Sequence, residues 1–144
     1  MEKISGHGSC FVCGTENPHS TGLVLYKNVD GTIHAEMIFN LSQQGPPGHV
    51  HGGASAAVLD EAMGAAVWVA GHHAAAVNLE INYRKPIPLD QKIIIKAEIS
   101  VVHPRKILTT SKMILPDGEI AVVGKGIYVE APHLFVDSEF TGKS

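Results

Sequence analysis

Alternation of apolar and polar residues marks most of the chain as β-strand. In the segment 32–39, every second residue from Ile33 to Phe39 is apolar, and Thr32, His34 and Glu36 are polar, which is the period of a strand with one buried face. Turn formers at 28–31 and 116–118 favour hairpins, and short turns between consecutive strands favour antiparallel pairing. The patterns predict six strands: Gly22–Lys27, Thr32–Phe39, Val77–Tyr83, Lys92–Val102, Lys106–Leu115 and Ile120–Glu130.

The segment from His51 to Ala70 breaks this alternation. It follows a loop rich in Gly and Pro, and Ala, Val, Leu, Met and Trp dominate it, which is typical of a helix that is apolar on nearly every face. The segment approaches the length of a membrane span, but Asp60 and Glu61 stand near its middle, where charge is costly in hydrocarbon. We therefore predict a long buried helix in a water-soluble domain.

The order is two strands, one helix and four strands. Because no second helix shares the burial, the sheet has to curl around the helix and leave only a few helical positions for a partner subunit. The predicted class is α+β, with a curved antiparallel sheet wrapped around one long central α-helix, the arrangement called the hotdog fold. We expect a single domain over residues 1–144, with an N-terminal segment at 1–20 and a flexible tail at 132–144.

Composition and charge narrow the range of expected partners and compartments. The chain has 144 residues, a formal net charge of -3 and a pI near 6.3, and its Lys and Arg residues are scattered, so neither nucleic acid nor an anionic membrane is an expected partner. The first residues lack the apolar run of a signal peptide, which predicts a cytoplasmic protein.

Three stretches resemble a known family. The run from Gly45 to Gly64 reads Gly-Pro-Pro-Gly-His-Val-His-Gly-Gly-Ala-Ser-Ala-Ala-Val-Leu-Asp-Glu-Ala-Met-Gly, and it looks like the signature of the hotdog-fold thioesterases. Cys10–Pro18 and Asn78–Pro88 are similar to the phenylacetate-type (PaaI-like) and human THEM-type branches. The resemblance implies an acyl-CoA thioesterase without a cofactor, acting as a homodimer or a dimer of dimers, with acyl-CoA as substrate.

Candidate catalytic groups lie on the predicted helix. The first N–H groups of a helix have no intrahelical partner, so the backbone N–H of Gly53, beside Gly52 and His51, is a candidate oxyanion donor. His51 is expected either to fix the loop or to touch the thioester. Asp60 follows Gly53 by about two turns and falls on the same helical face, and the resemblance implies that it is a nucleophile or a general base. Glu61 points roughly 100° away, and we interpret it as structural or solvated.

The chain departs from the family at two positions. Some relatives have an Asn where this sequence has Gly45, and a Ser or Thr on the strand after the helix where it has Ala76. Asn78 is the nearest polar substitute that could hold a water. The missing hydroxyl keeps open the alternative of a non-catalytic protein that binds acyl-CoA or an acyl carrier. Arg84 and Lys85 are candidate phosphate contacts for CoA.

A different hotdog enzyme, such as a hydratase, is a third alternative. Such an enzyme is expected to carry His five residues after the helical Asp, and this chain has Ala65 there.

The two cysteines form a Cys-x-x-Cys pair at Cys10 and Cys13. His7 and His19 flank it, which gives four possible zinc ligands within a short segment. Zinc sites usually draw ligands from two separated parts of the chain, so we favour two reduced, packed cysteines and expect no metal.

Overall fold

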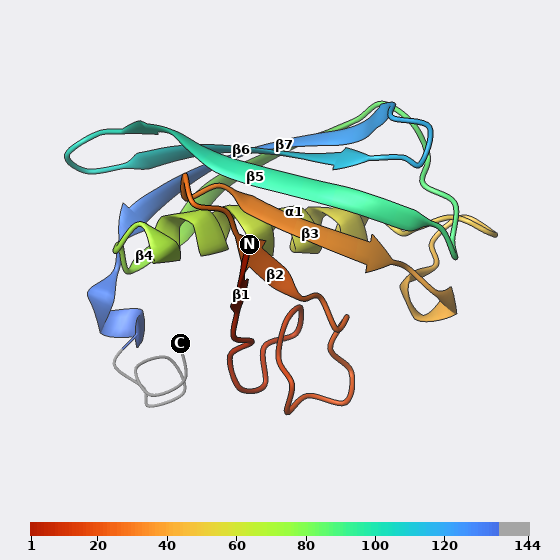
Figure 1. Cartoon of the computed structure of the whole chain (residues 1–144), viewed down its shortest axis with the longest axis horizontal. Helices are drawn as coiled ribbons and strands as arrows, with labels where there is room; N and C mark the ends of the chain where they lie inside the picture. Colours follow the sequence, from red (N-terminus) through yellow and green to blue (C-terminus); the bar gives the residue numbers. More distant parts are fainter. Residues whose placement is uncertain (136–144) are drawn as a thin grey trace.

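Seven antiparallel strands form one sheet that curves over helix α1 in the computed structural model, which describes residues 1–135 (Figure 1). Neighbouring strands follow the order β1-β2-β3-β5-β6-β7-β4 across the sheet. The predicted fold class, α+β with one helix against a curved antiparallel sheet, is confirmed. The elements are β1 (Glu2–Ile4), β2 (Leu25–Lys27), β3 (Ile33–Ile38), η1 (Leu41–Gln43), α1 (Gly52–Val69), β4 (Ala74–Tyr83), β5 (Lys92–Val102), β6 (Ile107–Ile114), β7 (Ile120–Glu130) and η2 (Pro132–Phe135).

One face of α1 lies against the sheet. Its fully buried residues recur at helical spacing, and they pack against buried side chains of β3, β5, β6 and β7 to form one core. A second stripe of α1, which includes Ala57, Asp60, Gly64 and Trp68, is only partly buried. The single chain therefore surrounds its helix less completely than the sequence suggested, because the sheet covers one side of it. No helix within residues 1–135 is long and apolar enough to cross a membrane.

The strand boundaries follow the sequence patterns closely, except near the N-terminus. Strand β2 is shorter than expected, because Leu23, two residues before it, donates its backbone N–H to the Val12 carbonyl in the N-terminal loop. Strand β1 pairs with β2 at the sheet edge and has no counterpart among the predicted strands. Its three residues are too few to show a period.

Strand β4 forms the other edge of the sheet. It is ten residues long and pairs only with β7 among the described strands. Apolar side chains on it are exposed, with Val77 at 59% and Leu79 at 40% of their full exposure. A register shift between Ala76 and Asn78 marks a β-bulge. An open, apolar edge of this length is a ready template for pairing with another strand.

The start of the predicted flexible tail is structured. Pro132–Phe135 forms the short helix η2, and the Phe135 ring lies 5.4 Å from the Trp68 ring of α1. The same Trp68 ring stacks on His73 at 4.6 Å. The rest of the predicted tail, 136–144, lies outside the described residues.

Candidate active site

The N-terminus of α1 is capped by His51. Its backbone is extended, with φ -63° and ψ 134°, and its Nδ1 accepts the backbone N–H of Gly53 at 2.8 Å. Because Nδ1 accepts, a neutral His51 ring carries its proton on Nε2. The capping bond occupies the Gly53 N–H that sequence analysis assigned to an oxyanion. Among the described residues, the N–H of the neighbouring Gly52 has no hydrogen-bond acceptor.

The loop before the helix holds His51 in place. The His51 backbone N–H donates to the Gln43 carbonyl at 2.8 Å. A Cβ at Gly45 would lie 2.8 Å from the His51 Cα, a backbone atom that cannot move aside. Gly45 is thus explained by the close approach of two backbone segments, and its candidate role in substrate binding stays a prediction.

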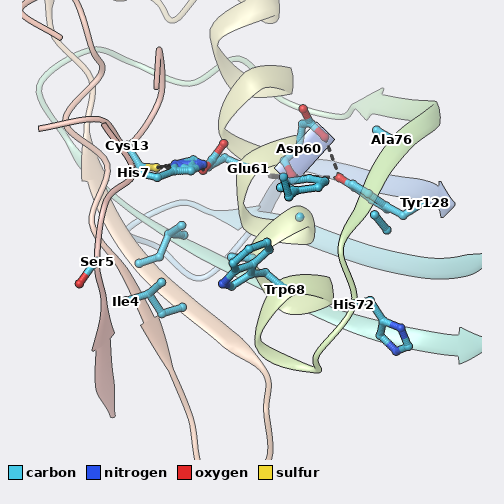
Figure 2. A pocket seen from close by; sticks show the side chains of 15 residues that line it. Ile4, Ser5, His7, Cys13, Asp60, Glu61, Trp68, His72, Ala76 and Tyr128 are labelled. Atoms are coloured by element: carbon cyan, nitrogen blue, oxygen red, sulfur yellow. Dashed lines mark hydrogen bonds and ion pairs between the residues drawn. The ribbon is translucent and has the colours of Figure 1, made fainter. Parts of the chain in front are cut away.

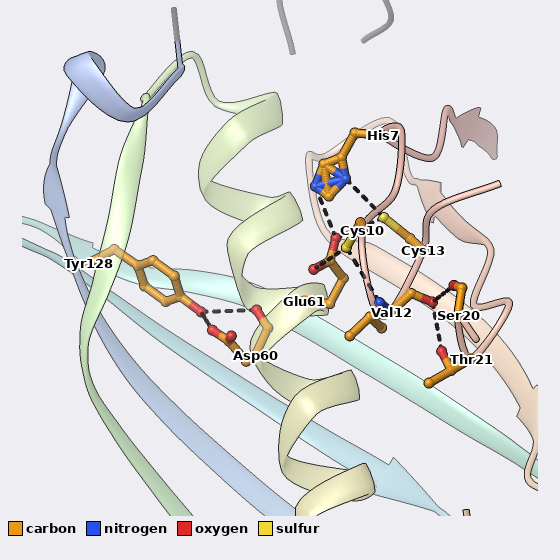
Figure 3. A network of polar contacts seen from close by, with 9 residues as sticks. All are labelled: His7, Cys10, Val12, Cys13, Ser20, Thr21, Asp60, Glu61 and Tyr128. Carbon is orange, nitrogen blue, oxygen red and sulfur yellow. Dashed lines mark hydrogen bonds and ion pairs between the residues drawn. The ribbon is translucent and has the colours of Figure 1, made fainter. Parts of the chain in front are cut away.

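Asp60 lies in the middle of α1, and Tyr128 of β7 orients its carboxylate. The Tyr128 hydroxyl donates to Asp60 Oδ1 at 2.7 Å, and it also lies 3.0 Å from the Asp60 backbone carbonyl (Figure 3). Burial raises the pKa of Tyr128 above its usual value and the nearby Asp60 carboxylate adds to this shift, so the phenol stays protonated and remains a donor.

Tyr128 lies beside Ala76, the position that lacks the expected hydroxyl. The two residues are register partners on the adjacent strands β4 and β7. Relatives were expected to place a Ser or Thr where Ala76 stands, and here the hydroxyl nearest to this position that bonds to Asp60 comes from Tyr128 on the neighbouring strand. Sequence reasoning missed this residue because the contact joins positions 68 residues apart.

A cavity of about 280 Å³ opens beside Asp60 (Figure 2). Its walls come from the partly buried stripe of α1, from β1, β4 and the N-terminal segment, and from η2. Most of the exposed surface of the cavity is apolar, which suits an acyl group, and Ser5, His7, Asp60, Glu61, His72 and Tyr128 add polar groups to its wall. The lining residues include Ile4, Leu25, Asp60, Glu61, Trp68, Ala76, Tyr128 and Phe135.

Glu61 points away from Asp60 and toward the N-terminal segment (Figure 3). The Cys13 thiol donates to Glu61 Oε2 at 2.9 Å, and His7 Nε2 lies 3.5 Å from the same oxygen. Burial raises the pKa of Glu61 to about 7. A hydrogen bond between the two thiols lowers the pKa of Cys10 and raises that of Cys13. The two adjacent carboxylates therefore have separate surroundings, as the 100° turn between them predicts.

The remaining candidate residues lie away from Asp60. Gly52, Arg84 and Lys85 line a separate surface hollow near the start of α1. Lys85 forms an ion pair with Glu119. Asn78 is exposed on β4, just past the bulge. The structure thus groups Arg84 and Lys85 with the helix N-terminus, and it groups Asn78 with neither hollow.

Gly53 and Asp60 share a helical face but not a cavity. Seven residues at 1.5 Å each separate them by roughly 10 Å along the helix axis, and Gly53 and His51 border a different hollow from the one beside Asp60. A single carbonyl group cannot reach both the Asp60 carboxylate and an N–H at the start of the same helix.

A seven-stranded antiparallel sheet curved over one central helix defines the hotdog class. Residues 47–114 match the family model of the thioesterase superfamily. Acyl-coenzyme A thioesterase THEM4 of Bos taurus is 32% identical over 140 residues, which cover 94% of this chain and 53% of that protein. The chain belongs to the hotdog-fold thioesterase superfamily, and the predicted resemblance to its THEM-type members is confirmed. It spans only about half the length of the curated relatives it matches, or less.

Solved structures of other proteins share this fold. A thioesterase superfamily protein is 33% identical, with a TM-score of 0.80, over 83% of this chain and 62% of that chain. A hypothetical thioesterase from Streptococcus pneumoniae TIGR4, crystallised with coenzyme A, has the same fold at 20% identity and a TM-score of 0.70, over 74% of this chain and 84% of that one.

Proposed function

We propose that this protein hydrolyses acyl-CoA thioesters to a free acid and CoA. The observation that carries the proposal is Asp60, a carboxylate held by the Tyr128 hydroxyl at 2.7 Å on the wall of an apolar cavity. The family supports the reaction class, since curated relatives are acyl-coenzyme A thioesterases. The alternative of a binding protein rested on Ala76 and Gly45, and the Tyr128 hydroxyl beside Asp60 favours hydrolysis over it.

The proposed chemistry uses Asp60 in one of two ways. As a general base, its carboxylate takes a proton from water while the water oxygen attacks the thioester carbonyl carbon. As a nucleophile, it attacks that carbon itself and forms an anhydride, which water then hydrolyses. In both cases the C–S bond breaks and CoA leaves as a thiol after gaining a proton. Negative charge develops on the carbonyl oxygen, so nearby N–H donors lower the barrier.

We place the oxyanion donor on a second copy of the chain. At a separation of roughly 10 Å, one thioester carbonyl cannot contact both the helix N-terminus and Asp60 of the same subunit. The exposed edge of β4, with Val77 and Leu79 on it, supports a homodimer in which two sheets join edge to edge. The unaccepted Gly52 N–H of one subunit then serves the Asp60 of the other. Gly53 is the alternative donor, and it requires His51 to release the capping bond.

CoA is proposed to bind by the hollow that Gly52, Arg84 and Lys85 line. Two cations beside a helix N-terminus suit the phosphates of the nucleotide. Pairing of Lys85 with Glu119 leaves Arg84 as the stronger candidate. A cytoplasmic location is also proposed, supported by the unpaired state of Cys10 and Cys13, because adjacent free thiols are typical of reducing compartments.

A thiol-release assay tests the function. We expect the protein to release CoA from one or more members of a panel of short, medium, long and aromatic acyl-CoAs, and the preferred member identifies the acyl group. Saturable binding of these substrates without release of thiol from any of them would contradict hydrolysis and favour the binding protein.

Replacing Tyr128 by Phe is expected to lower kcat by roughly 10- to 100-fold, because it removes a hydrogen bond to a charged group worth roughly 1.5–3 kcal/mol. KM should change little, since the ring that lines the cavity remains. Steady-state kinetics with the best acyl-CoA measures both constants. Tyr26→Phe, a matched change on β2, should leave them as in the wild type. An unchanged kcat in Tyr128→Phe would show that the hydroxyl does not position Asp60.

A further inference from the structure

Four side chains of metal-binding type converge between the N-terminal segment and α1. They are His7, Cys10, Cys13 and Glu61, and one ligand atom from each lies within 4.8 Å of all the others (Figure 3). The spacing of the sequence suggested His7, Cys10, Cys13 and His19. Among the described residues, Glu61 joins the first three, and His19 is not part of the group.

The ligand atoms of all four side chains lie within 4.8 Å of one another, so small side-chain shifts would bring them to the separations of a tetrahedral zinc site. Zn–S bonds of roughly 2.3 Å and Zn–N or Zn–O bonds of roughly 2.0 Å place neighbouring ligand atoms roughly 3.3–3.8 Å apart. In the structure, His7 Nδ1 lies 3.1 Å from Cys13 Sγ, and Cys10 Sγ lies 3.6 Å from Glu61 Oε1. The shortest pair, Cys13 Sγ and Glu61 Oε2 at 2.9 Å, needs to separate by less than 1 Å, since its proton leaves when a metal enters.

A backbone hydrogen bond and a required glycine fix the shape of the Cys-x-x-Cys turn. Gly14 donates its N–H to the Cys10 carbonyl at 2.9 Å and closes the turn. A Cβ at Gly14 would lie 2.3 Å from the Cys10 nitrogen, so only glycine fits. The Val12 N–H points at Cys10 Sγ at 3.4 Å, and such a donor stabilises a thiolate.

In the sequence, all candidate zinc ligands came from one short segment, which is unusual for a zinc site. Glu61 belongs to α1 and stands 48 residues after Cys13, so the ligands come from two separated parts of the chain, as in most zinc sites. Two soft sulfurs and an imidazole select zinc over magnesium or calcium. A dication would also offset two of the three negative charges of two thiolates and the mostly buried Glu61 carboxylate.

We propose that His7, Cys10, Cys13 and Glu61 bind one Zn²⁺ ion, which ties the N-terminal segment to α1. The site is structural, because all four positions are filled by protein. His7, Cys13 and Glu61 also line the Asp60 cavity, so the ion fixes one wall of that cavity. The inference goes beyond thioester hydrolysis and does not depend on it.

Metal content and cobalt spectroscopy test the site. Protein produced with added zinc and purified without chelator is expected to carry about one zinc per chain, measured by inductively coupled plasma mass spectrometry. Cobalt added to metal-free protein is expected to give the sulfur-to-metal charge-transfer band and the intense visible bands of tetrahedral thiolate coordination. Chelation of the zinc should lower Tm, because the ion binds the folded chain.

Three variants and one control assign the ligands. Cys10→Ser and Cys13→Ser are each expected to weaken metal binding and to lower the charge-transfer intensity per bound cobalt, because one thiolate is lost, and Glu61→Gln to weaken zinc binding by roughly tenfold or more. Glu61→Gln keeps the volume of the side chain and serves if a cysteine variant fails to fold. His19→Ala, in the same segment, should bind zinc as the wild type does. Absence of zinc and of a cobalt spectrum in the wild type, or zinc binding unchanged in all three variants, would overturn the proposal and leave two packed, reduced cysteines.

Discussion

Replacing Asp60 by Asn is expected to lower kcat for acyl-CoA hydrolysis by roughly 10²–10⁴-fold, the usual contribution of a general base, and by more if Asp60 is the nucleophile. The amide keeps the size of the carboxylate and can still accept the Tyr128 hydroxyl, so the helix and the cavity should persist. KM should stay close to the wild-type value. Thiol release under saturating substrate measures the loss, and circular dichroism and Tm verify the fold.

A matched carboxylate elsewhere provides the control. Glu98 is exposed on β5, and Glu98→Gln makes the same chemical change at a position outside both hollows that we assign to substrate. This variant should retain wild-type kcat. Asp60→Asn with kcat close to the wild type would remove Asp60 from the mechanism, because no other role proposed for it survives that result.

Replacing Gly52 by Pro is expected to lower kcat by roughly 10²–10³-fold, because proline removes the one N–H at the helix start that no described residue accepts. The fold should tolerate the change. Proline is favoured at the first helical position, and the extended backbone of His51, at φ -63° and ψ 134°, suits a residue that precedes proline.

Gly52→Ala is the matched control for steric effects. It adds a Cβ about 3.2 Å from the Tyr83 hydroxyl, as proline does, but it keeps the N–H. We expect Gly52→Ala to retain most of the activity. Equal losses in the Ala and Pro variants would mean that crowding against Tyr83, and not the N–H, is responsible, and the donor would then have to be sought at Gly53.

Mixed dimers test whether the site spans two subunits. When Asp60→Asn and Gly52→Pro chains are refolded together, each mixed dimer contains one site with an intact Asp60 facing an intact Gly52. Random mixing should restore about a quarter of wild-type activity. If the two inactive variants give no activity after mixing, Asp60 and Gly52 do not cooperate across an interface.

The fold was predictable from the sequence because its long elements carry clear periods. Strands β5 and β7 begin and end where the alternation does, and α1 differs from its predicted range by one residue at each end. Local pattern could not reveal β1, which has three residues, or η2, which is held by the Phe135 ring against Trp68. Both lie at the ends of the chain and owe their structure to contacts with distant elements.

The site was predictable only where its chemistry is local. Asp60 stands out because it is a carboxylate on an apolar helix, and His51 stands out because it precedes the helix start. The roles of Tyr128 and Glu61 depend on contacts between residues that are dozens of positions apart, and no spacing in the sequence predicts such contacts. The capping bond from Gly53 to His51 was also invisible, because the sequence shows which N–H groups lack intrahelical partners but not which side chain turns back to accept them.

The match between this chain and its family model has a practical consequence. The model covers residues 47–114, yet β7 with Tyr128 follows that range, and His7 and Cys13 on the cavity wall precede it. The part of the chain that identifies the superfamily therefore contains Asp60, whereas Tyr128, which bonds to its carboxylate, and His7 and Cys13, which line the cavity, lie outside that part. A match to the family model alone therefore does not predict the cavity beside Asp60, because part of its wall lies outside the matched range.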